Sequence, residues 1–269
     1  MDSRPYNSLG LLVRYLSYIL TAGNGKGHGI HSPFVYAFIR DLLNDKRKYY
    51  AFDRVESLRQ TLLHDHTAIP VTDLGAGSGR DNGSSRKLSH IAAHAAKGAK
   101  LGQLLFRTVN YFHPAVIIEL GTSLGISTSY LASANSGAKV YSIEGSPAIA
   151  AQAAKNFATL GLQNIETLAA DFDSALPRLL NTLPGFDLAY VDGNHRYEPT
   201  IRYFNQLVTK THADSVIILD DIHWSGEMEK AWEEIKNHPS VTCTIDLFFL
   251  GYVFFRPEFK VRQHFTIRY

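Results

Sequence analysis

The chain has 269 residues with 27 lysines and arginines against 25 aspartates and glutamates, which gives a formal net charge of +2. Hydrophobic residues make up 45% and charged residues 19% of the sequence, which excludes a wholly disordered chain and a histone-like polycation. The single cysteine, Cys243, excludes an internal disulfide framework and a cysteine-based zinc finger.

The first 65 residues are expected to be largely helical, with helices near 7–22, 34–44 and 53–64. The apolar run from Leu9 to Leu20 contains Arg14, is too short to span a bilayer and lacks a signal-peptide cleavage site. We therefore expect a soluble, cytoplasmic protein without a membrane partner. The apolar residues of this run are spaced like one helix face and predict a buried face made of Leu11, Leu12, Tyr15, Leu16, Ile19 and Leu20.

Residues 66–112 are predicted to connect this helical region to the rest of the chain, ending in an amphipathic helical stretch from Ser85 to Phe112. The glycine-rich turn Asp73–Gly79 is similar to a nucleotide-binding loop. However, the turn residues 80–83 follow it, and no acidic residue lies between Asp81 and Glu119, so we do not expect it to bind a nucleotide cofactor. The basic residues of this region predict a solvated helix face or, alternatively, an RNA contact: Arg80, Arg86, Lys87, Lys97, Lys100 and Arg107.

From residue 113 onward, short apolar strands alternate with helical segments, which is typical of a parallel sheet with crossover helices. The sequence predicts an α/β fold with a Rossmann-like, mostly parallel seven-stranded sheet, a terminal antiparallel hairpin and an N-terminal helical extension. The domains expected are 1–112, a helical cap and connector, and 113–269. The predicted strands are Ala115–Leu120, Lys139–Ile143, Ile165–Ala169, Phe186–Val191, Ser215–Leu219, Val241–Phe248 and Phe249–Phe255.

Each of the five crossover-connected strands is followed by a polar residue, and ligands of such sheets bind at the carboxyl ends of the strands. After Glu119 the glycines Gly121 and Gly125 are spaced GxxxG, which disfavours a pyrophosphate site and favours a ligand with a neutral or cationic centre near an acid. Glu144 suits the two hydroxyls of a ribose. Asp171 and Phe172 offer a carboxylate and a ring to an adenine. Ser127 or Thr128 is expected to cap the helix after the first strand.

Three segments, 119–127, 142–144 and 190–197, together resemble the class I S-adenosylmethionine-dependent methyltransferases, and more narrowly the catechol O-methyltransferase-like O-methyltransferases. The resemblance covers roughly residues 98–256. It implies that S-adenosylmethionine is the cofactor and that the residues around it are Glu119, Gly121, Thr122, Ser123, Gly125, Ser127, Glu144, Gly145, Asp171, Phe172 and Asp192.

The resemblance also implies a divalent cation, with Mg²⁺ expected, held by Asp192, Asp220 and Asp221. The chain departs from the family pattern twice, since Asp221 stands where Asn is usual and His195 stands where a catalytic Lys is usual. We therefore expect His195, with Asp192, to serve as the catalytic pair, with the imidazole taking the proton from the acceptor.

Structural roles remain open for several of these residues. Asp220 and Asp221 suit a helix cap or an ion pair, His195 a hydrogen bond in a turn, Glu144 an ion pair and Asp171 a plain turn. The histidine pairs, His28 with His31 and His90 with His94, are expected to be loop or surface residues, since neither has a third metal ligand nearby in sequence.

The sequence thus predicts a methyltransferase that methylates a hydroxyl on a small molecule with the help of a divalent metal. One alternative is an RNA methyltransferase acting on a modified tRNA base, and a second is a non-catalytic, cofactor-binding interaction protein. The methyl acceptor, the role of the N-terminal region and the oligomeric state, a homodimer included, are left open.

Overall fold

The computed structural model describes residues 5–71, 85–94 and 98–269. The chain divides into two compact units, one formed by Met1–Asp45 with Leu180–Tyr269 (the first unit) and the other by Lys46–Leu179 (the second unit). The domain boundary predicted at residue 112 stays a prediction. None of the helices in the described ranges is long and apolar enough to cross a bilayer.

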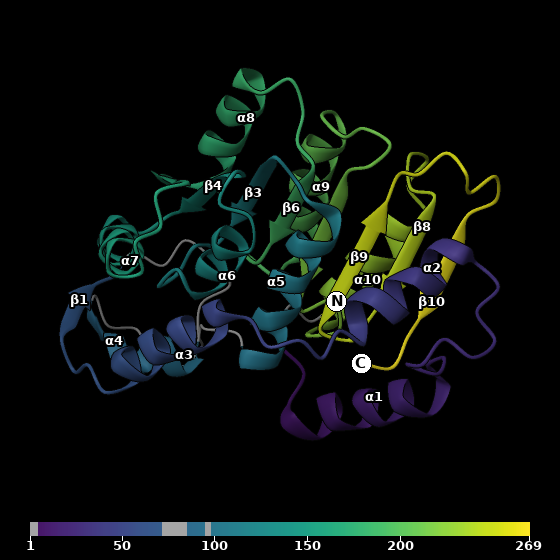
Figure 1. The fold of residues 1–269 in the computed structure, drawn as a ribbon, viewed down its shortest axis with the longest axis horizontal. Coiled ribbons are helices and arrows are strands. Elements are labelled where there is room, and N and C mark those ends of the chain that lie inside the picture. Colours follow the sequence, from purple (N-terminus) through teal and green to yellow (C-terminus); the bar gives the residue numbers. More distant parts are fainter. Residues whose placement is uncertain (1–4, 72–84, 95–97) are drawn as a thin grey trace. The chain divides into compact units, whose positions relative to one another are not determined.

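The second unit contains three parallel strands in the order β3-β4-β5, namely Val116–Leu120, Lys139–Glu144 and Ile165–Ala169. The helices α6 (Ile126–Ala134) and α7 (Pro147–Thr159) connect them, and α8 (Phe172–Thr182) follows β5. Helix α7 packs against β4 and β5 (Figure 1). Because the strands are parallel, all three end at the same edge of the sheet, which places their following loops together.

The remainder of the second unit differs from the prediction of one helical stretch over residues 85–112. Strand β2 (Ser85–Lys87) pairs antiparallel with β1 (Ala68–Pro70), and two separate helices follow, α4 (Leu88–His94) and α5 (Ala99–Phe112). Since β1 engages residues 85–87 in a ladder, those residues cannot begin the helix. Helix α3 (Tyr50–Leu63) packs against α4 and α6 and contributes Phe52, Val55 and Leu62 to a buried core.

The first unit carries five strands in the order β10-β8-β9-β7-β6. The pairs β6–β7 and β8–β10 are parallel, whereas β9 is antiparallel to both β7 and β8, which confirms the predicted terminal hairpin. Beyond the β1–β2 pair, the described strands therefore number eight, one more than predicted. The additional strand is β10, the last one. Its residues alternate between partly buried and exposed, and its sequence lacks the apolar run that predicted the other strands. The bounds are β6 Leu188–Val191, β7 Val216–Asp220, β8 Cys243–Asp246, β9 Leu250–Phe254 and β10 Gln263–Thr266.

The first unit also contains α1 (Ser8–Thr21), α2 (Pro33–Ala37) with the π-helical turn η1 (Phe38–Leu43), α9 (Tyr197–Val208) and α10 (Gly226–Lys236). The predicted single buried face of α1 is partly wrong. Leu11, Tyr15 and Ile19 pack around Tyr18 and Phe248, but Leu12, Leu16 and Leu20 are 51%, 51% and 81% exposed. Both faces of this helix are apolar, so periodicity alone does not indicate which one is buried.

Candidate functional site

The loop between β3 and α6 makes a tight turn. Gly121 and Gly125 have φ angles of 102° and 80°, and Ser123 has a φ of 48°. A Cβ on Gly125 would lie 2.4 Å from Cε1 of Phe157 on α7, so a glycine is required there on both conformational and steric grounds. The turn therefore brings the backbone N–H of Ser123 to the end of the neighbouring strand β4.

A buried hydrogen-bond network lies beneath this turn. Glu119 is fully buried, and its carboxylate accepts hydrogen bonds from Ser127 Oγ at 2.6 Å, Thr128 Oγ1 at 2.5 Å and Ser142 Oγ at 2.5 Å. The Thr122 hydroxyl lies 2.5 Å from Ser142 Oγ. These contacts join β3, the turn, α6 and β4, so Glu119 fixes the shape of the loop from inside the unit.

The expected cap at Ser127 or Thr128 is wrong. Helix α6 begins after Gly125, a cap residue without a side chain, so Ser127 and Thr128 already lie inside the helix. Both of their hydroxyls donate to Glu119 instead. The network includes Thr128 and Ser142, whose roles in it the sequence analysis missed. The available signal was Ser142 itself, a polar residue inside an otherwise apolar, buried strand.

Glu144 ends β4 and is held by backbone donors from two loops. Its Oε2 accepts from the Ser123 N–H at 2.9 Å and its Oε1 accepts from the Ser146 N–H at 2.9 Å. Burial raises the pKa of Glu144, and the backbone N–H groups oppose that effect. A carboxylate oxygen has two lone pairs, so an oxygen that accepts one N–H can accept a further hydroxyl. The arrangement therefore suits a ligand with neighbouring hydroxyls.

Asp171, which follows β5, accepts hydrogen bonds from a residue of its own turn. Its carboxylate accepts from the Ser174 N–H at 2.8 Å and from Ser174 Oγ at 2.7 Å, and these bonds lower its pKa. Asp171 is exposed and immediately precedes α8, whose first residue, Phe172, is half-buried. Asp171 therefore has the structural role in a turn that the sequence analysis left open. Contact of Asp171 and Phe172 with an adenine stays a prediction.

In the first unit, the residues after β6 form an oriented acid–imidazole pair. His195 Nε2 lies 3.3 Å from Asp192 Oδ1, and Tyr190 donates its hydroxyl to Asp192 Oδ2 at 3.2 Å. The side chains of His195 and Asp192 are 21% and 17% exposed, so both are sheltered but reachable. The His195 ring also lies 5.5 Å from the ring of Trp224, in the loop after β7. This geometry places the imidazole beside a carboxylate that can orient it.

The residues after β7 do not complete a metal site with Asp192. Asp220 is 1% exposed at the end of the strand, and Asp221 sits at a φ of 52° with its N–H donating to the Phe249 carbonyl at 2.7 Å. Within the residues that the structure describes, no group of three or more acidic, histidine or cysteine side chains is placed to hold a metal ion. A cap role for either aspartate on α10 is also excluded, since Ser225 is the residue that caps that helix.

A second charged cluster, around Glu229 of α10, was missed by the sequence analysis. Glu229 accepts hydrogen bonds from Tyr6 OH at 2.7 Å and Arg14 Nε at 2.9 Å, and its Oε1 lies 3.4 Å from His223 Nδ1. His223 Nε2 lies 2.8 Å from Asp246 Oδ2. More than 200 residues separate Tyr6 and Arg14 from Glu229, so no local sequence pattern could indicate this contact.

The hydrogen bonds and charges of this cluster shift the pKa values of Glu229 and His223. Burial opposes ionisation of Glu229, but the contacts with His223, Tyr6 and Arg14 prevail and lower its pKa to about 2. Burial likewise opposes protonation of His223, but Asp246 and Glu229 raise its pKa to about 9. The cluster thus ties the N-terminal segment to the loop after β7, which begins with Asp221.

The other predicted features form no second site among the described residues. Of the basic residues, Lys100 is exposed, although desolvation of its ammonium lowers its pKa, and the Arg107 guanidinium lies 5.1 Å from the Phe52 ring. Arg80, Lys97 and the turn Asp73–Gly79 lie outside the described residues.

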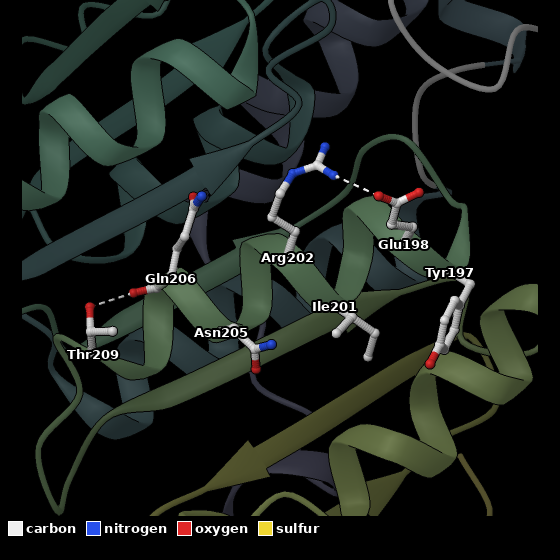
Figure 2. Close-up of a pocket in the computed structure, with 7 residues that line it drawn as sticks. All are labelled: Tyr197, Glu198, Ile201, Arg202, Asn205, Gln206 and Thr209. Atoms are coloured by element: carbon white, nitrogen blue, oxygen red, sulfur yellow. Dashed lines mark hydrogen bonds and ion pairs between the residues drawn. The ribbon is translucent and has the colours of Figure 1, made fainter.

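A groove of about 470 Å³ runs along α9 and is lined by Tyr197, Ile201 and Arg202 among others, with Arg202 paired to Glu198 at 3.7 Å (Figure 2). It contains none of the predicted site residues.

Comparison with known proteins finds a methyltransferase-domain match in the part of the chain that carries the resemblance. Residues 118–222 match a family described as a methyltransferase domain. An uncharacterized protein of Acanthamoeba polyphaga mimivirus is 34% identical over 68 residues, which span 24% of this chain and 31% of that protein. The chain therefore matches about a third of the length of that relative.

The fold is similar to that of several solved methyltransferase structures. A putative O-methyltransferase from Klebsiella pneumoniae has a TM-score of 0.57 at 16% identity, over 80% of this chain and 94% of that one. An O-methyltransferase from Bacillus cereus in complex with SAH has a TM-score of 0.56 at 18% identity, over 82% and 96%. The SAM complex of TomG from Streptomyces achromogenes has a TM-score of 0.56 at 17% identity, over 82% and 95%. These likenesses confirm the predicted Rossmann-like α/β fold.

Proposed function

We propose that this chain is an S-adenosylmethionine-dependent methyltransferase that methylates a hydroxyl group on a small molecule. The observation that carries the proposal is the position of Glu144 at the end of β4, beside the tight turn after β3. Backbone amides from two loops hold its carboxylate there. This pair of features lies inside the segment that matches the methyltransferase domain. Two of the similar structures are complexes with SAH or SAM.

The second unit would bind the cofactor through its strand ends. Glu144 would accept hydrogen bonds from the two ribose hydroxyls, and Gly121, Ser123, Gly125 and Gly145 would let the backbone approach the ligand closely. Glu119, Thr122 and Ser127 would act by holding the turn in shape, because their polar atoms bond to one another and to Ser142. Asp171 and Phe172 would border the cofactor, and the contribution of Asp192, a residue of the first unit, stays a prediction.

The first unit would prepare the acceptor. The Nε2 atom of His195 lies 3.3 Å from Asp192 Oδ1, so Asp192 would hold the tautomer protonated on Nε2 and Nδ1 would take the proton from the acceptor hydroxyl. Asp192 would then stabilise the imidazolium. The cofactor supplies a methyl group already activated on a sulfonium, so the remaining task for the protein is to hold the reactants in line, which is worth about 7–11 kcal/mol.

The divalent cation stays a prediction. Asp192, Asp220 and Asp221 offer the hard oxygen donors that Mg²⁺ prefers, but as placed among the described residues they do not form a three-ligand group. Assay of methyl transfer in EDTA tests the point: full activity contradicts a required metal, whereas a loss that Mg²⁺ restores supports one. The cytoplasmic location is likewise a proposal.

The test is methyl transfer from radiolabelled S-adenosylmethionine to a panel of phenols, catechols and aliphatic alcohols. The proposal predicts label in at least one small-molecule product. Transfer to unmethylated tRNA alone, with a steep salt dependence, would instead support the RNA methyltransferase. Tight cofactor binding with no transfer to any acceptor would support the non-catalytic interaction protein.

A further inference from the structure

Helix α1 has a second apolar face that the described residues of the first unit leave uncovered. One face packs on Phe248 through Tyr15 and Tyr18. The opposite face presents five large apolar side chains that are between 51% and 81% exposed: Leu9, Leu12, Val13, Leu16 and Leu20. Single exposed leucines are ordinary, but a contiguous apolar stripe marks an interaction surface.

The spacing of this stripe favours another helix as its partner. Leu9, Val13, Leu16 and Leu20 follow one another at intervals of four, three and four residues, which is the repeat of the seam between two packed helices. The pattern is also symmetric about its centre. An antiparallel second copy therefore places Leu9 opposite Leu20 and Val13 opposite Leu16, so that these four apolar residues are matched.

The charges around the stripe favour a second copy over a lipid surface. Arg14 is the one charged residue of α1, and it lies off the stripe, bound to Glu229 Oε1 at 2.9 Å and over the Tyr6 ring at 3.5 Å. Because the stripe carries no charge, two copies of it can pair without bringing like charges together. Helices that bind membrane surfaces carry lysines and arginines along their polar face, which α1 lacks.

We propose that α1 is the self-association surface of this protein, with two chains pairing their stripes antiparallel about a two-fold axis. The exposed side-chain surface of the stripe amounts to roughly 500 Å² per chain, so full pairing would bury about 1,000 Å², the lower limit of a specific interface. Antiparallel pairing also opposes the two helix dipoles. The dimer is independent of the proposed activity, because the cofactor residues lie on other elements.

Sedimentation equilibrium of the full chain over a range of concentrations tests the pairing. The wild type is expected to dimerise, and Leu16→Glu to weaken the dimer at least 100-fold. Thr21→Glu is the matched control, since Thr21 is exposed on the same helix but off the stripe, and it should remain dimeric. Circular dichroism and thermal melting establish that both variants fold. A monomeric wild type, or a Leu16→Glu protein that dimerises normally, would overturn the proposal.

Disulfide trapping tests the orientation. An oxidised mixture of Val13→Cys and Leu16→Cys chains should cross-link into a heterodimer, because these positions face each other in the antiparallel pair. Each variant oxidised alone should cross-link poorly, and the native Cys243 is buried. Efficient cross-linking of Val13→Cys with itself would contradict the antiparallel arrangement. Flotation of monomeric wild type with phosphatidylcholine–phosphatidylglycerol vesicles would assign the stripe to a membrane instead.

Discussion

At the scale of single residues, two carboxylates near the turn after β3 have different tasks. Glu119 is fully buried and accepts hydrogen bonds from the hydroxyls of Ser127, Thr128 and Ser142, so its role is structural. Glu144 is half-buried at the end of β4 and is held by backbone amides from two loops. Only Glu144 combines a fixed position with access for a ligand.

Substitution of Glu144 should remove recognition of the ribose. Wild type is expected to bind S-adenosylhomocysteine about tenfold more tightly than its 2′-deoxy analogue, because the carboxylate forms a charge-assisted hydrogen bond to the hydroxyl. In Glu144→Gln this difference should largely disappear in calorimetric titrations. Glu166→Gln is the control, since Glu166 is a half-exposed residue of β5 paired with Lys139. An undiminished preference in Glu144→Gln would contradict the assignment.

Substitution of His195 should affect the chemical step and leave cofactor binding intact. His195→Ala is expected to lower kcat about 10²- to 10⁴-fold, which is the usual contribution of a general base. Asp192→Asn should lower kcat less, because the imidazole loses its orienting partner but remains in place. If His195→Ala instead raised only KM, with kcat unchanged, the ring would be an acceptor-binding group and not the base.

At the scale of secondary-structure elements, the turn between β3 and α6 depends on close packing against α7. Gly125→Ala is expected to destabilise the protein by about 2–4 kcal/mol, since it adds strain at positive φ to an overlap with Phe157. Gly161→Ala is the matched control, with a φ of 66° and open space around the new methyl group, and should cost only about 1 kcal/mol. Urea unfolding measures both, and equal losses would exclude the packing argument.

The contact between α1 and α10 should make stability depend on pH on the acid side. Because its pKa falls from 4.5 to about 2 in the folded chain, Glu229 stabilises the protein fully above pH 4.5 and progressively less as the pH falls towards 2. Allowing for partial exposure, the contribution is about 1–2 kcal/mol. Glu229→Gln should therefore lower the free energy of unfolding at pH 6, and its difference from wild type should shrink as the pH falls through about 2. A constant difference across this range would contradict the assignment.

At the scale of the whole molecule, the alternation of strands and helices after residue 113 predicted the α/β class, since buried parallel strands have nearly continuous apolar sequences. The residues at the strand ends could be predicted for the same reason, because the fold fixes where each strand's carboxyl end lies. The sequence could not indicate the contacts of Tyr6 and Arg14 with Glu229, since these join distant segments. Nor could it decide which apolar face of α1 is buried, because that depends on tertiary packing.

The central claim is that the strand ends of the second unit bind the nucleoside of S-adenosylmethionine. The most direct test is calorimetric titration of the full-length protein with S-adenosylhomocysteine, with the folded state verified beforehand by circular dichroism. The account predicts saturable binding of one ligand per chain that is weakened about 10- to 100-fold in Glu144→Gln. A folded protein that binds no S-adenosylhomocysteine at millimolar concentration, or that binds it equally well in Glu144→Gln, would contradict it.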